Sequence, residues 1–550
     1  MIPDLLASGA EVRSGPVRRP AVAGRTIFDY ADDLAIQMPA SCQRSGRCHE
    51  CVIEVSSGAE SLSETTDAES FLKAPFRLAC QATIERTDSV IEFRPLRRRL
   101  RILLGQDEPL DGSVAEAFDS PVRRAGGVVT YDGVHLDIDR GRALGLAVDV
   151  GTTTVVLELI DLESGAILGV AGFENPQGFG GSDVMNRISY DGNAPGELRK
   201  ALGRALNQEI RTLCSELGID RRVIYEAVIV GNATMRDCFF GIDVSPIGQR
   251  PYKSTIEIEA RAGIRSTTVL SERAHRLGVW MHPQGFVVSA PLIASHVGAD
   301  VAADLVALDA ERLTGRWMLV DIGTNTEVVV SDGSRILAAS CPAGPAFEGG
   351  LVRFGMPGSE GAIERVHLDG DAWQLETIGG VAAEGICGSG LIDLLAELRR
   401  GGRMSPLGVF GERAREVVVE PIRGITLSRE DASNLAQAKA ANACGQAILL
   451  RHIGAEPGDL DQVFLAGGFA NHVDVANAIS IGFLAKVQPD RVTKIGNASI
   501  GGARRLLLSR ARRVALEALV GRIEHIELET TPDFFELFVE ACRFEPMAAA

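Results

Sequence analysis

The sequence lacks long apolar runs, a high density of cysteine and an excess of positive charge, and each absence excludes a class of protein. No run of about 18 apolar residues occurs, and residues 1–20 lack the apolar stretch of a signal peptide, so we expect a cytoplasmic protein that does not enter a membrane. Ten cysteines in 550 residues are far fewer than a disulfide scaffold uses. The net charge of −17 has the wrong sign for a surface that neutralises phosphates, which argues against nucleic acid as a partner.

Length and composition indicate a globular protein of several domains. A chain of 550 residues exceeds what one core usually holds, and 45% hydrophobic with 23% charged residues is an ordinary globular balance. We expect an N-terminal extension at 1–24, a small domain at 25–95, a linker with a small strand-rich unit at 96–143, and two halves of a larger domain at 144–315 and 316–550. The linker is marked by Arg94, Arg97, Arg98, Arg99 and Arg101.

From residue 144 onward, apolar runs rich in β-branched residues end in glycine and are followed by helical periodicity. Such runs occupy residues 146–150, 228–230, 318–322 and 463–466. This alternation predicts an α/β fold in which helices cover the faces of a parallel or mixed sheet. The run Leu-Ala-Val-Asp-Val-Gly-Thr-Thr-Thr-Val at 146–155 recurs as Met-Leu-Val-Asp-Ile-Gly-Thr-Asn-Thr-Glu at 318–327, which predicts two related halves.

Four of the ten cysteines lie between residues 42 and 80, and this clustering points to a metal site. Cys42, Cys48 and Cys51 share one ten-residue loop, while Cys80 comes from a distant segment. Such an arrangement suits an iron–sulfur cluster, because the loop can wrap one iron while the far cysteine completes the second. Gly46 gives the loop the backbone freedom that wrapping requires. Structural zinc stays open as an alternative, although zinc sites usually pair cysteines in two close doublets.

The repeated Asp-x-Gly-Thr motif predicts a phosphate site built from two turns. In each copy a buried strand ends in glycine, after which backbone N–H groups and hydroxyls face outward. Asp149 and Asp321 are placed to orient a magnesium-bound water or an attacking nucleophile. One such hairpin is often a plain strand–turn–strand, but two copies 172 residues apart favour a functional site. The candidate binding residues are Gly151, Thr152, Thr153 and Thr154 in the first copy and Gly323, Thr324, Asn325 and Thr326 in the second.

Two further glycine-rich turns complete the predicted nucleotide site. Gly467 and Gly468 follow an apolar strand, and paired glycines there let a flat adenine ring approach the backbone. A plain strand-to-helix turn is the alternative. Gly388, Ser389 and Gly390 open a predicted helix whose first N–H groups suit ribose or phosphate, although the same residues also suit a simple helix cap.

These motifs resemble two known families. The cysteine spacing, with residues 26–30 before it and 77–81 after it, is similar to that of a ferredoxin holding a 2Fe-2S cluster, and the five-residue first gap is closer to vertebrate-type and bacterial redox-partner ferredoxins. The glycine turns resemble the ASKHA superfamily of acetate and sugar kinases, Hsp70 and actin. The fold class implied is multidomain, with an N-terminal α+β ferredoxin-like (β-grasp) domain followed by a duplicated α/β ASKHA domain of ribonuclease-H-like halves.

The combination of both domains resembles the reductive activators of corrinoid proteins. Further matching segments are residues 175–177, 182–187, 230–235, 341–349 and 532–538. The resemblance implies an ATP-dependent enzyme that moves one electron from a 2Fe-2S cluster to the cobalt(II) corrinoid of a methyltransferase system, restoring cobalt(I). The four cysteines would be the cluster ligands, and the glycine turns would bind ATP and Mg²⁺. Implied partners are the corrinoid protein and an upstream electron donor, a reductase or ferredoxin, with a homodimer as an open expectation.

The sequence departs from the ferredoxin pattern at Gln43 and His49, where many family members have glycine after the first two cysteines. We expect this departure to alter hydrogen bonding around the sulfurs and to leave ligation unchanged. Two other functions stay open. One is a redox-regulated small-molecule kinase that uses the same ATP cleft, with the cluster as a sensor. The other is a non-catalytic, nucleotide-gated binding module similar to Hsp70, in which the cysteines hold structural zinc.

Overall fold

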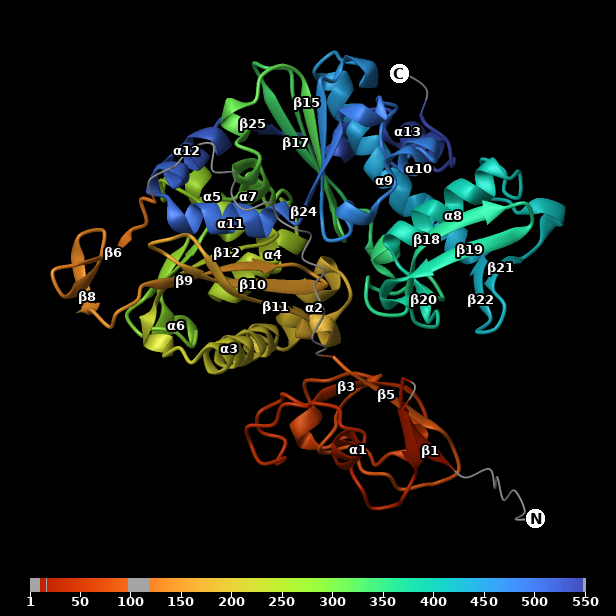
Figure 1. Ribbon diagram of the computed structural model, residues 1–550, viewed down its shortest axis with the longest axis horizontal. Coiled ribbons are helices and arrows are strands. Elements are labelled where there is room, and N and C mark those ends of the chain that lie inside the picture. The colour runs from red at the N-terminus through yellow and green to blue at the C-terminus, as the bar shows by residue number, and fades with distance from the viewer. Residues whose placement is uncertain (1–9, 16, 97–117, 548–550) are drawn as a thin grey trace. The chain divides into compact units, whose positions relative to one another are not determined.

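The computed structural model describes residues 10–15, 17–96 and 118–547 of the chain (Figure 1). The predicted linker arginines Arg97, Arg98, Arg99 and Arg101, and residues 1–9 of the predicted N-terminal extension, lie outside the described residues. The described residues up to 96, together with Phe173–Thr212, form unit 1, and those of 118–172, together with 213–547, form unit 2. No helix in the described part of the chain is long and apolar enough to cross a membrane.

Unit 1 contains a five-stranded sheet in the order β2-β1-β5-β3-β4. Its strands are β1 (Glu11–Ser14), β2 (Val17–Pro20), β3 (Val52–Ser57), β4 (Phe76–Leu78) and β5 (Ile91–Pro95). β1 runs parallel to β5, and the other pairs are antiparallel. Burial alternates along β1 and β5, as a sheet with one covered face requires. The sheet begins upstream of residue 25, where the sequence predicts the start of this domain.

Three helices complete unit 1. α1 (Ile27–Asp33) begins with a capping box, in which Thr26 Oγ1 accepts from Asp29 N at 3.2 Å and Thr26 N donates to Asp29 Oδ2 at 2.9 Å. Its buried side chains include Phe28 and Tyr30. The segment Phe173–Thr212 contributes α2 (Val184–Asn193) and most of α3 (Glu197–Leu217).

A buried ion pair fixes the strand that leads to Cys80. Glu69 is 1% exposed, and its Oε1 accepts from Arg77 Nε at 2.8 Å and from Leu78 N at 2.9 Å. The Arg77 guanidinium also donates to Ser63 O at 2.8 Å. Burial opposes ionisation of Glu69, but the bonds from Arg77 and from the backbone outweigh it and lower the pKa of this carboxyl. The end of β4 is therefore fixed by this ion pair as well as by the hydrogen bonds of the sheet.

Unit 2 contains two six-stranded mixed sheets built on one plan. The first has the order β11-β10-β9-β12-β14-β13, with β9 (Leu144–Val150), β10 (Thr154–Asp161), β11 (Ile167–Glu174), β12 (Ile224–Val230), β13 (Ser271–Arg273) and β14 (Phe286–Ser289). The second has the order β24-β23-β15-β16-β17-β25, with β15 (Trp317–Ile322), β16 (Thr326–Ser331), β17 (Ile336–Cys341), β23 (Gln462–Ala466), β24 (Val492–Gly496) and β25 (Ile523–His525). In each sheet an antiparallel hairpin, β9–β10 or β15–β16, adjoins a parallel strand, β12 or β23. This repeated plan agrees with the two related α/β halves predicted from the sequence.

Helices cover both faces of the second sheet, which explains the nearly continuous burial of its strands. Met318 and Val320 point into a core shared with α8 (Gly388–Arg400) and α9 (Arg429–His452). Trp317 and Leu319 point to the other face, where they join a core with residues of α7 (Ala299–Ala307). Because successive side chains of a strand alternate between faces, a strand buried on both sides reads as an unbroken apolar run.

Helix α11 (Ala498–Leu508) comes late in the sequence but packs on the first sheet, against β9, β12 and α7 (Figure 1). Gly145 in β9 makes room for it, since a Cβ at this position would lie 2.8 Å from the Leu507 side chain. Helix α4 (Ala233–Phe240) follows directly after β12. The first half of unit 2 is thus completed by a helix from the second half of the sequence.

The remaining described elements surround these sheets. The strands β6 (Val122–Ala125), β7 (Val128–Tyr131) and β8 (Val134–Ile138) form a small sheet in the region where the sequence predicts a strand-rich unit. A further sheet contains β18 (Ala362–Asp369), β19 (Ala372–Thr377) and β20 (Gly385–Ile386), and β21 (Glu416–Glu420) pairs with β22 (Ile425–Ser428). The other helices are α5 (Thr255–Arg261), α6 (Ala274–Leu277), α10 (Val475–Ser480), α12 (Arg510–Val520) and α13 (Phe534–Ala541).

We predict that Glu69→Ala destabilises unit 1 by about 3 to 5 kcal/mol, because the change leaves the buried Arg77 without its counter-charge. Hydrogen exchange of peptides spanning β3 and β4, measured across a urea series, gives the free energy of unfolding. The control is Glu60→Ala, which alters an exposed side chain and is expected to change the free energy by less than about 0.5 kcal/mol. Equal values for the two variants would contradict the structural role of the ion pair.

Candidate functional site

Unit 2 contains a cleft of about 300 Å³ that is lined by both hairpin turns, β9–β10 and β15–β16. The ends of β12 and β23 also reach it, through Asn232 and through Gly467 and Gly468. Cavities of this size hold small molecules, with a few polar groups fixing their orientation. Both halves of the unit therefore contribute to one potential binding site.

The two turns meet at a single carboxylate. Thr153 Oγ1 from the first turn lies 3.3 Å from Thr324 Oγ1 of the second. Both hydroxyls donate to Glu348 Oε2, at 2.7 Å from Thr153 and 2.5 Å from Thr324. Gly151 keeps the first turn tight, because a Cβ there would lie 2.5 Å from Thr154 O. The hydroxyls thus face a carboxylate in the cleft, and a phosphate would meet the same donors.

Further acidic side chains line the cleft and raise one another's pKa. Burial raises the pKa of Asp149 to about 7, opposed by a hydrogen bond from Asn497 Nδ2 at 3.1 Å and reinforced by the charge of Asp321. Burial and the charge of Asp321 raise the pKa of Asp300 to about 7. Burial also raises the pKa of Asp321 itself to about 6, and that of Glu327 well above its usual value. Such a group of carboxylates can take up a divalent cation, which would relieve the repulsion.

Four helices begin at the cleft, and the positive ends of their dipoles favour an anion there. α4 starts at its cap Asn232, whose Nδ2 donates to Thr152 Oγ1 at 3.0 Å. α7 carries Asp300 in its first turn, α8 starts beside Ser389, and α11 starts at its cap Asn497. Carboxylates that suit a cation and helix N-termini that suit phosphates lie in one cavity, so the donor set fits a nucleotide with Mg²⁺. A bound Mg²⁺ keeps most of its water and needs only one or two protein carboxylates.

The cleft also has an apolar part that fits a purine ring. Phe347, Met356, Ile378 and Phe469 line it. Gly467 has φ of 115°, and a Cβ there would collide with the carbonyl of Ile322, whereas the corresponding space at Gly468 is open. A side chain on Gly388 would collide with Phe347 O. At Gly467 and Gly388, glycine is therefore required by close packing against the neighbouring backbone, whereas only the space at Gly468 is open.

Of the predicted nucleotide residues, Thr326 and Gly390 do not line the cleft, and all the others do. Thr326 is 1% exposed and pairs within the sheet with Ile322 and Cys341. Gly390 lies against Ile363, and a Cβ on it would collide with the carbonyl of that residue. Thr326 and Gly390 therefore serve packing next to the site.

In unit 1 the four predicted cysteines gather as two pairs. Cys42 and Cys48 shift each other's thiol pKa, and so do Cys51 and Cys80. Within residues 10–15, 17–96 and 118–547, no three His, Cys, Asp or Glu side chains converge to hold a single metal ion. A zinc ion needs four donors around one point, whereas a two-iron cluster takes two cysteines on each iron. Two pairs of thiols therefore suit a 2Fe-2S cluster.

The loop that carries the first three cysteines adopts left-handed backbone conformations. Gln43 and His49, which stand where many ferredoxins have glycine, both have φ of 54°, and Gly46 has φ of 78°. A non-glycine residue in this region costs about 1 to 3 kcal/mol. The loop is held by Arg44, which pairs with Asp29 at 3.1 Å and stacks its guanidinium 4.1 Å from the centre of the Phe28 ring.

The Gln81 side chain donates to the sulfur of a predicted cluster ligand. Gln81 Nε2 lies 3.3 Å from Cys80 Sγ and 3.3 Å from Arg44 O, so it joins the cysteine loop to the end of β4. A hydrogen bond from the Cys51 thiol, opposed by burial and assisted by Gln81, lowers the pKa of Cys80 to about 6. Hydrogen bonds to the sulfurs are one of the factors that set the potential of an iron–sulfur cluster.

Comparisons with known proteins identify relatives over nearly the whole chain. Family profiles match the chain in three consecutive parts: a 2Fe-2S iron–sulfur cluster binding domain at residues 11–85, the RACo middle region at 144–312, and the C-terminal ASKHA domain of RACo at 316–549. A solved structure described as a reductive activator for a corrinoid, iron–sulfur protein matches with a TM-score of 0.70 and 27% identity, over 97% of this chain and 98% of that one. The chain belongs to the family of reductive activators of corrinoid proteins.

Two characterised relatives extend this assignment. The corrinoid activation enzyme RamQ of Eubacterium limosum is 28% identical, over 93% of this chain and 95% of that protein. A reductase of the cobalt(II) form of a methylated-amine-specific corrinoid protein, from Methanosarcina barkeri, is 24% identical, over 72% of this chain and 76% of that protein. The fold class and the family resemblance stated from the sequence are confirmed.

Sequence reasoning about this reductive activator missed several cleft residues. Asn232 and Glu348 lie in segments 230–235 and 341–349, which were matched to the family without a role being assigned. Glu327 ends the second copy of the repeated run. Asp300 and Asn497 stand at helix starts far from any recognised motif, and only the fold brings them to the cleft.

We predict that the activator binds Mg²⁺ with a non-hydrolysable ATP analogue more tightly as the pH rises from 6 to 8. Asp149, Asp300 and Asp321, with pKa values of about 7, 7 and 6, are partly protonated at pH 6 and lose these protons as the pH rises to 8, which favours the binding of a cation. Calorimetric titration in two buffers of different ionisation enthalpy gives the affinity and the number of protons released. A pH-independent affinity without proton release would contradict this reading of the cleft.

We also predict that Gln81→Leu makes the reduction potential of the bound cluster more negative. The change removes the N–H dipole that faces Cys80 Sγ and that would stabilise the added electron. Redox titration followed by visible absorbance measures the potential. Gln37→Leu changes an exposed glutamine of the same domain and serves as the control, with no shift expected. An unchanged potential in a fully loaded Gln81→Leu protein would refute the role assigned to Gln81.

Proposed function

We propose that this chain is an ATP-dependent reductive activator that transfers one electron from a 2Fe-2S cluster to the cobalt(II) corrinoid of a methyltransferase system and so restores cobalt(I). The observation that carries the proposal is the presence, in one chain, of four cysteines arranged in pairs and a cleft that suits Mg²⁺-nucleotide. The relatives support it, because one is named a corrinoid activation enzyme and another a reductase of a corrinoid protein.

The driving force explains why nucleotide would be needed. When bound, the cluster supplies one electron, which the cobalt(II) of the substrate accepts to become cobalt(I). Plant-type ferredoxin clusters have potentials of about −400 mV, and we take cobalt(II) in a corrinoid to be harder to reduce than the cluster of this chain. Each 59 mV of uphill transfer costs about a factor of ten in the equilibrium constant. Nucleotide would offset this deficit by favouring a protein–protein state in which cobalt loses a ligand, since a ligand shifts an equilibrium only through differential affinity.

Different cleft residues would bind different parts of the nucleotide and its Mg²⁺. Thr153 and Thr324 would turn their hydroxyls from Glu348 toward the phosphates, with the N-terminus of α8 at Ser389 assisting. Asp149 and Asp321 would orient water around Mg²⁺. The glycines 467 and 468 would accept the adenine ring beside Phe469.

The partners and setting follow from the same proposal. Residues 25–95 carry 12 acidic and 7 basic side chains, which suits docking of an upstream reductase or ferredoxin with a basic surface. The four cysteines 42, 48, 51 and 80 would ligate the cluster. We place the activator in the cytoplasm, with a corrinoid protein as substrate, and propose a homodimer as the oligomeric state to be tested by sedimentation.

The decisive assay uses the full chain with its cluster reduced under anaerobic conditions, mixed with a cobalt(II) corrinoid protein of a methyltransferase system. We predict that cobalt(I), followed by its visible absorbance, forms in at least tenfold higher yield with Mg²⁺-ATP than without it, the ratio that corresponds to about 59 mV. Asp149→Asn is expected to remove the ATP effect while the cluster spectrum stays unchanged.

Three outcomes would contradict the proposal. Equal cobalt(I) yields with and without ATP would remove the role of the cleft. A colourless, iron-free protein after anaerobic reconstitution would favour the zinc-holding binding module. ATP-dependent phosphorylation of a small-molecule acceptor, without cobalt(I) formation, would favour the redox-regulated kinase.

A further inference from the structure

Two of the four helices that begin at the cleft are joined at one carbonyl. Gly231 O, just before α4, accepts from Ala299 N at 3.0 Å and from Asp300 N at 3.3 Å, in the first turn of α7. A Cβ on Gly298 would lie 2.6 Å from Asn232 Cα, so the two backbones are in close contact. The positions of Asn232 and Asp300 in the cleft therefore depend on each other.

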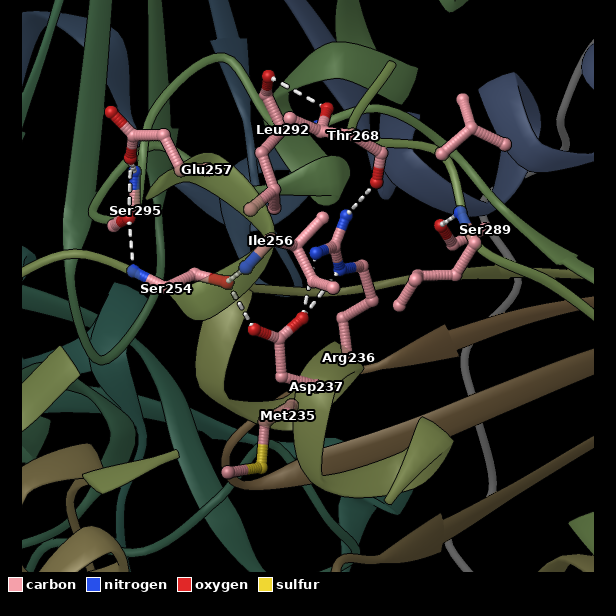
Figure 2. Close-up of polar contacts among 12 residues, drawn as sticks. Met235, Arg236, Asp237, Ser254, Ile256, Glu257, Thr268, Ser289, Leu292 and Ser295 are labelled. Carbon is pink, nitrogen blue, oxygen red and sulfur yellow. Dashed lines mark hydrogen bonds and ion pairs between the residues drawn. The ribbon is translucent and has the colours of Figure 1, made fainter. Parts of the chain in front are cut away.

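A second link between these helices runs through a chain of buried polar side chains (Figure 2). Asp237 on α4 accepts from Ser254 Oγ at 2.5 Å, and Ser254 N donates to Ser295 Oγ at 2.7 Å. Ser295 Oγ and N both donate to Glu257 Oε2, the latter at 2.7 Å. All four residues are at most 5% exposed. Ser295 lies three residues before Gly298, so this series of hydrogen bonds reaches the segment that leads into α7.

A buried ion pair anchors the α4 end of this chain (Figure 2). The Arg236 guanidinium donates to Asp237 Oδ1 at 2.9 and 2.6 Å and to Thr268 O at 2.8 Å. Thr268 Oγ1 in turn accepts from Leu292 N at 2.8 Å, again in the segment before α7. Arg236 and Asp237 are both fully buried. A buried network whose members are paired in this way is rigid, because any other arrangement would leave a polar group unsatisfied.

We propose that Ser295 is a positioning residue of the nucleotide cleft and acts through Asp300. This inference rests on the proposed binding of Mg²⁺-ATP. The Ser295 hydroxyl bridges Ser254 N and the Glu257 carboxylate, and it thereby fixes the segment that leads into α7. Removal of the bridge loosens that segment relative to α4, with the bonds from Ala299 N and Asp300 N to Gly231 O left to hold the start of α7, and the Asp300 carboxylate is then less firmly fixed in the cleft.

The test is a calorimetric titration of the full chain with Mg²⁺ and a non-hydrolysable ATP analogue. Ser295→Ala is expected to weaken binding about threefold to tenfold, equivalent to about 0.7 to 1.4 kcal/mol. Ser254→Ala removes the hydrogen bond from Ser254 Oγ to Asp237, which belongs to the same series of bonds, and is expected to weaken nucleotide binding by the same factor. The matched control is Ser289→Ala in β14. It removes an equally buried hydroxyl, which accepts a hydrogen bond from Leu270 N at 2.9 Å and takes no part in the series of bonds from Asp237 to Glu257 (Figure 2).

A double-mutant cycle with Asp300→Asn separates positioning from a general loss of stability. If Ser295 acts through Asp300, Ser295→Ala has no further effect on affinity in the Asp300→Asn protein, whereas the melting temperature falls by similar amounts in the Ser295 and Ser289 variants. Affinities of Ser295→Ala and Ser254→Ala equal to that of Ser289→Ala would overturn the inference while leaving the proposed function intact. Absence of nucleotide binding by the unaltered chain would instead refute the proposed function.

Discussion

The cleft of unit 2 gathers carboxylates from both halves, and their burial together with their mutual charge disfavours the ionisation of all of them at once. Asp149 ends the central strand of the first sheet and Asp321 that of the second, and each disfavours ionisation of its neighbours. Glu348 accepts hydroxyls from both turns. A bound Mg²⁺-nucleotide would relieve this repulsion and take over those donors. The nucleotide would contact both halves of unit 2. Its binding free energy could therefore favour one arrangement of the two halves over another.

The sequence could predict the parts of this site that lie on regular, repeated elements. The two Asp-x-Gly-Thr turns follow buried strands, and a strand ending in glycine exposes its next residues wherever it occurs. Asp300 and Asn497 could not be predicted, because their place depends on how α7 and α11 pack on the sheets. Thr326 and Gly390 adjoin true lining residues, but strand pairing and contact with Ile363 turn them toward the core.

For the cysteine loop, the spacing in the sequence predicts the cluster ligands, whereas the backbone conformation of the loop depends on packing. Four thiols with gaps of five, two and 28 residues specify a ligand set, and the structure arranges them as two pairs. The sequence alone did not reveal that Gln43 and His49 would adopt the left-handed conformation usually left to glycine. Contacts from Arg44 and Gln81 hold the loop in that strained form.

The central claim is that the nucleotide cleft and the corrinoid substrate are energetically coupled. Coupling is reciprocal, so a nucleotide that favours the productive complex must itself bind more tightly when the corrinoid protein is present. The most direct measurement is therefore the dissociation constant of Mg²⁺-ATP for the full chain, with and without saturating cobalt(II) corrinoid protein. The account predicts that the two constants differ by the factor by which nucleotide changes the affinity for the corrinoid protein. Identical constants would contradict it.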